Sequence, residues 1–203
     1  MKRYRWIVLL LFFLTLVGCS HQVPLRQGLE VSDPPNPKYD KKVLLVMPQD
    51  QAERIIRHKP DPLADTYVYA GGPALKNTLQ NVLDQLFRET DFAYTLPQGG
   101  GDYDLAVVVD FKQWNIVLNI YTGNTVDLDV DYLVLDPSGK TLLHIPTQAS
   151  SKDRYSGGDL AATFLAGAFY NIGKMKASSG AAWDQATANS IAELLDKMVV
   201  LLE

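Results

Sequence analysis

The sequence has few of the residues that build catalytic and metal-binding motifs. Its 203 residues include one cysteine and three histidines. A single cysteine cannot form a disulfide within the chain. The three histidines, His21, His58 and His144, share no short zinc-ligand spacing, and a Ser-His-Asp site would have to be assembled across the fold. We therefore expect no metal, no cofactor and no enzymatic activity.

Basic residues are scarce beyond the N-terminus. Three of the 19 lysines and arginines fall within residues 1–5, whereas none of the 23 acidic residues falls within residues 1–18. Without residues 1–18 the chain has 185 residues, with 16 basic against 23 acidic side chains and a formal charge of −7. An acidic surface argues against nucleic acid as a partner. A chain of this length suffices for one domain with a hydrophobic core.

The N-terminus has the pattern of a secretory signal peptide. Lys2, Arg3 and Arg5 precede WIVLLLFFLTLVG, an apolar run over residues 6–18 that ends at small residues. This run is shorter than the ~20 apolar residues that a membrane-spanning helix needs. We expect residues 1–18 to be removed as a signal peptide, and a permanent anchor helix is the alternative.

The only cysteine directly follows this signal, in the sequence Leu-Val-Gly-Cys over residues 16–19. The pattern resembles the lipobox of bacterial lipoproteins. The resemblance implies cleavage between Gly18 and Cys19, a diacylglycerol on the Cys19 thiol, and a further acyl chain such as palmitate on the new amino terminus. Because Ser20 rather than Asp follows the cysteine, the resemblance also implies the periplasmic side of the outer membrane, for a Gram-negative source.

Residues 19–42 are predicted to be a flexible tether between the acyl chains and the folded domain. They are polar and contain Pro24, Pro34, Pro35 and Pro37. Proline-rich segments favour extended conformations, so about 20 residues at roughly 3.1 Å each would hold the domain ~60 Å from the bilayer.

The folded body is expected to begin with a strand at residues 41–48, KKVLLVMP. A helix is predicted over residues 73–88, where Gly71-Gly72 form a turn and Pro73 occupies the first helical position. Its apolar residues recur at intervals of three and four on one face: Leu75, Leu79, Val82, Leu83, Leu86 and Phe87.

A long β region is predicted after a short strand at residues 92–95. Its apolar positions are odd from Leu105 to Phe111 and even from Trp114 to Ile120. Because a shift of one residue moves side chains to the other face of a sheet, we predict a bulge or bend at residues 110–113. Further strands are expected over residues 126–134 and 140–148, joined by a DPSG turn.

The chain ends in a predicted amphipathic helix. Its buried side is marked by Trp183, Ile191, Leu194, Leu195, Met198 and Leu202. The order of strand, helix, several antiparallel strands and helices predicts an α+β fold, a two-layer sandwich with a mostly antiparallel sheet and helices packed on one face. We expect a single periplasmic domain over residues 43–203.

The arrangement of residues 43–150 is similar to the periplasmic domains of small outer-membrane lipoproteins, such as the curli-secretion channel lipoprotein and the lipopolysaccharide-assembly lipoprotein. This resemblance rests on the order of elements and transfers no site residues. It implies a non-enzymatic part in an envelope assembly.

Two local patterns could bind a ligand or be purely structural. Asp127, Asp129 and Asp131 alternate along one strand, where they either line a solvated face or hold a hard cation such as Ca²⁺. Since same-face carboxylates on a straight strand are about 7 Å apart and point in parallel, we expect the solvated face. The sequence AGGP at residues 70–73 precedes a helix, where phosphate can bind. It lacks the Gly-Lys-Ser/Thr ending and the GxGxxG spacing, so we expect a structural turn.

Residues 160–172, LAATFLAGAFYNI, carry no charge and are rich in small residues. They form either a core helix packed on the sheet or an exposed contact surface for another protein or for the membrane. Phe164, Leu165, Phe169 and Tyr170 are the candidate contact residues of this segment.

The sequence favours an outer-membrane lipoprotein that acts as a subunit or assembly factor of a cell-envelope transport or surface complex. Its expected partners are the membrane, through the acyl chains, and other envelope proteins or further copies of itself. The alternative is a carrier or sensor that binds a lipid or glycolipid, which an apolar cavity walled by Trp114, Phe164 and Phe169 would favour. A hydrolase is a third possibility, and it would need His58 or His144 to converge with a carboxylate and a nucleophile.

Overall fold

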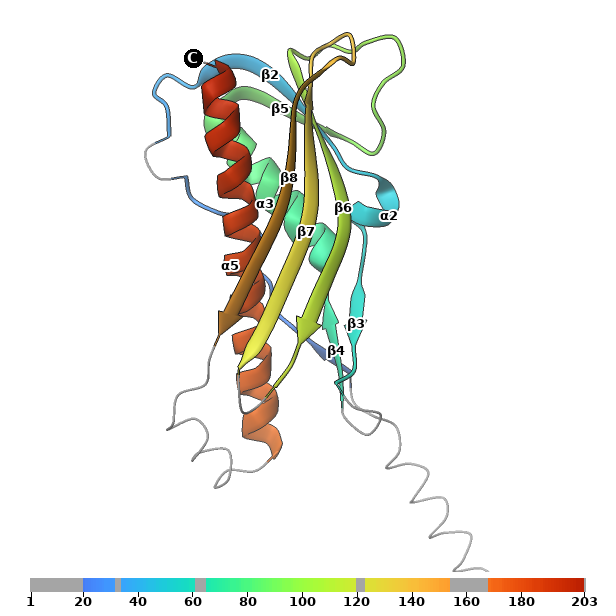
Figure 1. Ribbon diagram of the computed structural model, residues 1–203, viewed down its shortest axis with the longest axis vertical. Coiled ribbons are helices and arrows are strands. Elements are labelled where there is room, and N and C mark those ends of the chain that lie inside the picture. Colours follow the sequence, from blue (N-terminus) through green and yellow to red (C-terminus); the bar gives the residue numbers. More distant parts are fainter. Residues whose placement is uncertain (1–19, 32–33, 61–64, 120–122, 154–167, 203) are drawn as a thin grey trace, which may run out of the picture.

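The structure is a computed structural model that describes residues 20–31, 34–60, 65–119, 123–153 and 168–202, excepting the side chains of residues 168–174 (Figure 1). Its elements in chain order are β1 (Ser20–Gln22), β2 (Tyr39–Val46), α2 (Gln49–Ala52), β3 (Ile56–His58), β4 (Thr66–Tyr69), α3 (Gly71–Leu86), β5 (Phe87–Ala93), β6 (Leu105–Val117), β7 (Asn124–Leu135), β8 (Thr141–Asp153) and α5 (Ala168–Leu202).

The main sheet has five strands in the order β5-β2-β6-β7-β8. The predicted α+β class is confirmed, but the sheet is less antiparallel than expected. β2 runs parallel to both β5 and β6, and only β6, β7 and β8 form an antiparallel meander. The reason is that α3 carries the chain from β2 back to the start of β5, and the connection over residues 94–104 returns it again to the start of β6. Such returns place the next strand parallel to the first.

A second, three-stranded sheet was not anticipated. Its order is β1-β4-β3, with β1 parallel and β3 antiparallel to the central β4. Its strands are three or four residues long. Strands of this length are too short to show a clear alternation in sequence, which explains why the pattern was missed.

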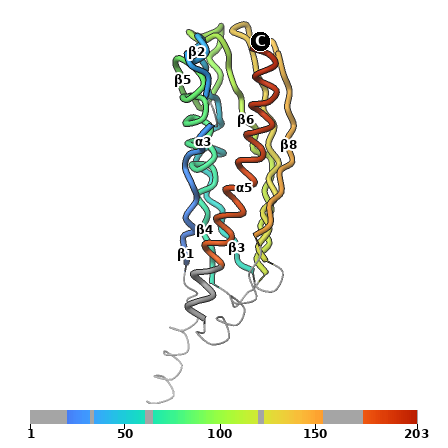
Figure 2. Tube along the Cα trace, turned by 90° about the vertical axis from the view of Figure 1, so that its left-hand side faces the viewer, coloured from blue at the N-terminus to red at the C-terminus, as the bar shows by residue number. Residues whose placement is uncertain are grey.

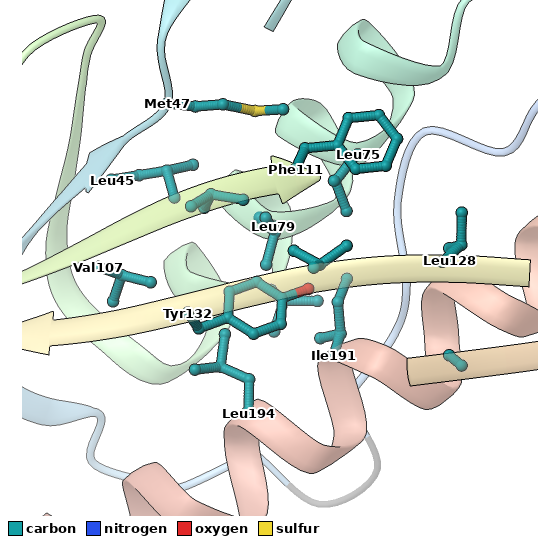
Figure 3. Packing of buried hydrophobic residues seen from close by; sticks show 14 of the residues in the cluster. Leu45, Met47, Leu75, Leu79, Val107, Phe111, Leu128, Tyr132, Ile191 and Leu194 are labelled. Carbon is teal, nitrogen blue, oxygen red and sulfur yellow. The ribbon is translucent and has the colours of Figure 1, made fainter. Parts of the chain in front are cut away.

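Helices α3 and α5 cover one face of the main sheet (Figures 1 and 2). α5 packs against β7 and β8, and α3 against β2 and β5. The core between them is drawn from all these elements, as the side chains in Figure 3 show. Its largest fully buried members are Trp183, Tyr69, Tyr132, Phe87, Phe111, Leu45, Met47, Leu75, Leu79, Leu83, Ile145 and Ile191.

The predicted bulge in β6 is confirmed. The ladder between β6 and β7 shifts register between Phe111 and Gln113. The extra residue lets Phe111 and Trp114 both face the helices, where their ring centroids lie 4.9 Å apart. Trp114 and the fully buried Trp183 of α5 meet edge-on at 4.2 Å. The bulge therefore builds an aromatic cluster at the centre of the core.

The predicted helix over residues 73–88 is observed as α3, displaced by two residues toward the N-terminus. It ends at Leu86 because Phe87 takes an extended conformation and begins β5 without a loop. All six residues assigned to its apolar face in the sequence are buried.

Candidate functional site

Residues 20–31, which we call the N-terminal strap, lie on the folded domain. β1 pairs with β4 in parallel, with Ser20 opposite Thr66. The backbone N–H of Val23 then donates to the carbonyl of Val68 at 2.9 Å, and the Val23 side chain is buried. The strap is therefore part of the domain from its first residue.

The prediction of a flexible tether over residues 19–42 is wrong for the strap, and it is also wrong for residues 39–42, which form the start of β2. The strap carries apolar side chains that pack against the core: Val23, Leu25, Leu29 and Val31. Proline and polar residues separate them in sequence, so they show no helix or strand period. Their burial depends on a surface made by distant elements.

That surface is the seam between α3 and α5. On the α5 side, the backbone N–H of Arg26 donates to Asp184 Oδ1 at 2.9 Å. On the α3 side, Gln85 donates to the Leu29 carbonyl at 2.7 Å and accepts the Val31 N–H at 3.0 Å. Burial raises the pKa of the Asp184 carboxyl, and the Arg26 N–H partly offsets this effect. The strap thus joins the two helices along their seam.

Small residues let the strap approach closely. A Cβ at Gly180 in α5 would lie 2.6 Å from the Pro24 carbonyl oxygen, nearer than side-chain atoms approach. Beside the strap, a mainly apolar groove of about 360 Å³ runs along α5. The residues that line it are Leu29, Glu30, Val31, Val82, Ala188, Ile191, Ala192, Leu195 and Asp196.

Several residues predicted from the sequence to be functional lie outside the described part of the chain. Gly18 and Cys19 precede it, and Phe164 and Leu165 fall in the gap between β8 and α5. Phe169 and Tyr170 are placed in the first turn of α5, but their side chains are not described.

Trp114 is partly buried and packs against the core. Its ring packs against Phe111 and Trp183, and it lies directly over Gly71, because a Cβ there would overlap its six-membered ring. Of the three residues of the proposed cavity wall, Trp114, Phe164 and Phe169, only Trp114 has a described side chain. That side chain packs against the core and does not line a cavity there.

The glycines of the AGGP turn have a structural reason. Gly71 lies under Trp114, and Gly72 lies against the backbone of α2, where a Cβ would overlap the Gln51 carbonyl. The Gly72 N–H donates to the Arg54 carbonyl at 3.0 Å. Both glycines permit close packing at the start of α3, and they are the first two residues of the helix rather than the predicted turn before it.

The three alternating aspartates lie on the outer face of the main sheet, the face opposite the helices. Asp127 accepts from Ser150 Oγ at 2.5 Å and from Asn115 Nδ2 at 3.4 Å. In the described part of the chain no group of three or more His, Cys, Asp or Glu side chains is arranged to hold a metal ion.

Asp131 is the most buried carboxylate of the outer face, with 8% of its surface exposed. Its Oδ2 lies 2.6 Å from Lys112 Nζ and 3.0 Å from His144 Nε2. These partners, Lys112 before His144, lower the pKa of the Asp131 carboxyl, and Asp131 in turn raises the pKa of Lys112. The carboxylate is therefore held in its charged form.

A shallow hollow of about 350 Å³ opens on this outer face where β6 bulges. It spans β6, β7 and β8, and more of its exposed lining is apolar than polar, although most of the residues that line it have polar side chains: Gln113, Asn115, Asp127, Leu128, Asp129, Gln148, Ala149 and Ser150. The hollow offers hydrogen-bond donors and acceptors with an excess of acceptors and negative charge. It can bind a polar or cationic surface.

β8 is an edge of the main sheet, since among the described residues no strand pairs with its outer side. It is 13 residues long, and its residues alternate between core and solvent over most of its length. Pro146 interrupts its run of backbone donors, as is common in edge strands. The edge and the hollow adjoin, so β8 and the outer face form one continuous accessible surface.

No helix within the described ranges is both long enough and apolar enough to cross a membrane. This includes α5, which has 35 residues but many polar side chains.

Comparison with solved structures shows the fold in other proteins. A Xanthomonas campestris protein of the DUF330 family superposes with a TM-score of 0.50 over 88% of this chain and 99% of its own, at 11% sequence identity. At this identity the likeness concerns the fold alone. No protein-family model matches the sequence, and no curated protein matches it.

Two further structures are more distant. A Caulobacter crescentus protein provisionally assigned as a lipoprotein has a TM-score of 0.35 and 14% identity, over 61% of this chain and 80% of its own. An uncharacterized protein has a TM-score of 0.38 and 14% identity, over 87% and 98%. Scores this low carry no argument about this chain.

Proposed function

We propose that the chain is a lipoprotein anchored through Cys19 to the periplasmic side of the outer membrane. There it acts as a non-enzymatic subunit or assembly factor of a cell-envelope transport or surface complex. The signal pattern of residues 1–18 and the lipobox cysteine support the anchor. The acyl chains supply the membrane attachment, because each buried CH₂ contributes about 0.8 kcal/mol.

The observation that carries the assembly role is the accessible surface of β8 and the outer face. The inner face of the sheet is covered by α3 and α5, whereas the outer face over β6, β7 and β8 contains the hollow and carries the three aspartates of β7 beside it. Unpaired strand edges and polar, hollowed faces are surfaces that proteins use to bind other chains. The partner that we propose is another envelope protein or a further copy of this chain.

The uncharged segment over residues 160–172 extends this surface in the proposal. In the sequence this segment follows β8, which ends at Asp153, after six further residues, and its last residues begin α5. In this proposal Phe164, Leu165, Phe169 and Tyr170 supply an apolar part of the contact.

Site-specific photocrosslinking in intact cells tests the proposal. A photoreactive residue replaces Gln148 on the outer face, and in a matched strain it replaces Gln185 on the exposed side of α5. We expect a discrete adduct from position 148 and none from position 185. We also expect the adduct from position 148 to disappear when Cys19→Ala removes the lipid attachment site.

A discrete adduct from position 185 with none from position 148 would contradict the proposed surface. An uncrosslinked monomer from both positions would contradict the assembly role as a whole. An adduct that persists in the Cys19→Ala strain would show that the partner is bound without the anchor.

The groove beside α5 favours a second function, binding of a lipid or glycolipid. Its volume of about 360 Å³ lies within the range of small-ligand sites. Ala192→Trp would fill it, and Ala181→Trp, on an exposed position of α5 outside the groove, is the matched control. Lipid that co-purifies with the wild-type and Ala181→Trp proteins but not with Ala192→Trp would support this function. Equal lipid content in all three, or none, would contradict it.

A further inference from the structure

We infer that the domain rests directly on the lipid surface with one particular end against the headgroups. We call this the anchor end and define it by Ser20, Lys59, Thr66, Val117 and Lys152. The inference rests on the proposed lipidation of Cys19, and it adds an orientation and a lipid-facing surface that lipidation alone does not require.

The first step concerns the length of free chain. Ser20 is already paired in β1, so a single peptide unit separates it from Cys19. One residue spans at most about 3.5 Å. The acyl chains on Cys19 therefore cannot lie far from the start of β1, whatever the conformation of Cys19.

The second step concerns how firmly β1 is held. Its three residues pair in register with Thr66, Tyr67 and Val68 of β4. His21 Nε2 lies 2.9 Å from Asp65 Oδ2, and these side chains are only 22% and 29% exposed. Beyond β1, the strap continues along the seam of α3 and α5. To regain the reach of a tether, the chain would have to detach all of these contacts.

The third step concerns which part of the domain lies beside Ser20. β1 and β4 begin together at the lower end of the molecule in Figure 1, where β6 and β8 end and α5 begins. The C-terminus and the turn that contains Lys140, which we call the far end, lie at the opposite end (Figure 1). α5 runs between the two ends, and its 35 residues make a helix about 50 Å long.

The side chains at the anchor end suit contact with lipid, but exposed apolar side chains also lie at the far end, at Val200 and Leu201 near the end of α5, so the orientation rests on the position of Ser20. At the anchor end, Val117 is 46% exposed, and the basic side chains of Lys59 and Lys152 are exposed. The carboxylate of Asp65 there faces His21. An exposed apolar side chain and exposed lysines suit the headgroup region of a bilayer.

Toward the far end, acidic side chains gather around one lysine. Lys42 Nζ lies 3.1 Å from Glu89, 3.2 Å from Asp91 and 3.2 Å from Asp102. Hydrogen bonds that Lys42 donates to these carboxylates, first of all to Glu89, raise the pKa of Lys42 and keep it charged. Three carboxylates against one ammonium leave this region negative, so anionic headgroups repel it.

Spin labelling of the lipidated protein in vesicles tests the inference. Because Cys19 would be the only native cysteine and would carry the lipid, Lys59→Cys and Lys140→Cys each introduce a single free thiol for a nitroxide. Both lysines are exposed, so the two substitutions are matched. The vesicles contain phosphatidylethanolamine, phosphatidylglycerol and a lipid with a headgroup-bound nickel chelate. We expect collision of the nitroxide with the nickel chelate to be several-fold more frequent at position 59 than at position 140.

A spacer provides the control for chain length. About 20 Gly and Ser residues are inserted after Ser20, followed by a second serine that takes the place of Ser20 in β1. An insertion of this length has a root-mean-square reach of about 25 Å. We expect it to remove most of the difference between positions 59 and 140 while leaving vesicle binding intact.

Flotation of the vesicles separates the two hypotheses. If the protein floats with the vesicles and the nitroxides at both positions collide equally often, the orientation is wrong and the anchor stands. If the wild-type protein does not float with the vesicles, or if the Cys19→Ala variant floats as well as the wild type, the proposed lipid anchor on Cys19 is wrong. The proposed orientation is then wrong too, because it depends on that anchor.

Discussion

The inner and outer faces of the main sheet are made by the same strands and differ in chemistry, most clearly along β7, although the outer face also carries a smaller apolar cluster that includes Leu44, Val46 and Ala106. Along β7 the even residues face the helices, and the odd residues face outward: Val126, Leu128, Val130, Tyr132 and Val134 inside, and Thr125, Asp127, Asp129, Asp131 and Leu133 outside. Every even residue in this set is at most 2% exposed. Successive side chains of a strand point to opposite faces, so one stretch of sequence serves both.

The polar groups of the two faces are also used differently. On the inner face Tyr132 Oη lies 2.9 Å from Ser190 Oγ, which lies 2.7 Å from Thr147 Oγ1, and all three residues are buried. On the outer face, Asp131 pairs with Lys112 and His144, whose side chains are 45% and 54% exposed. We therefore expect substitutions of the inner face to change stability, and those of the outer face to change what the protein binds.

The largest expected effect is at the aromatic cluster of the inner face. Trp183→Ala removes a fully buried side chain that contacts Phe111 and Trp114. We expect the free energy of unfolding to fall by about 3–5 kcal/mol, as measured by urea unfolding followed by circular dichroism. Tyr94→Ala, at a site that is 40% exposed, is the control and should cost far less. Equal losses would show that the cluster is not the centre of the core.

A smaller effect is expected where the inner face meets the start of α3. Gly71→Ala places a methyl group into the ring of Trp114. Relief of the overlap requires backbone or side-chain shifts, so we expect a loss of about 1–3 kcal/mol in unfolding free energy. Gly28→Ala is the matched control, because a Cβ at Gly28 would lie 3.4 Å from its nearest neighbour, Asn81 Oδ1. An unchanged midpoint for Gly71→Ala would mean that α3 and β6 are less closely packed than described.

The buried polar contact of the inner face is expected to contribute at a similar or lower level. Ser190→Ala leaves the hydroxyl of Tyr132 without that partner in the core. We expect a loss of about 1–3 kcal/mol, because an unsatisfied buried polar group carries a desolvation penalty. The double variant Tyr132→Phe with Ser190→Ala should recover part of this loss. A double variant as unstable as the sum of the two single variants would rule out the interaction.

The smallest effect is expected on the outer face. Asp131→Asn weakens the attraction to Lys112 and His144, and because these partners are about half exposed we expect a loss below about 1 kcal/mol. The native pKa of Asp131 is lowered, so its contribution is present above the unfolded carboxyl pKa of about 4 and is lost as the pH falls through the native value. Urea unfolding at a series of pH values should show the two proteins differing at neutral pH and converging in acid. A difference that grows in acid would have the wrong sign.

The α3 helix and the β6 bulge could be predicted because their signals are local. A run of apolar residues at intervals of three and four identifies α3, and a change of parity within 18 residues identifies the bulge at Phe111–Gln113. The bulge also implied that Trp114 faces inward. Its contact with Trp183 could not be foreseen, because 69 positions separate the two residues and no local pattern joins them.

The strap shows why the candidate site was only partly predictable. Its one proline, Pro24, and its polar residues indicate an extended chain, and the strap is without helix. Whether an extended chain is free or bound depends on the surface available to it. Here the surface is formed by Gln85 and Asp184, which lie 54 and 158 positions from the strap residues that they bind.

The sequence alone determined the signal pattern, the position of the one cysteine and the α+β class. Each of these follows from composition or from a residue pattern that repeats within a single helix or strand. Only the tertiary structure decided that β2 is parallel to its neighbours, that the hollow adjoins β8, and that Ser20 is already paired with the domain. Each of these depends on contacts between residues far apart in the chain, and the free energy of such contacts is defined only after the intervening elements have packed.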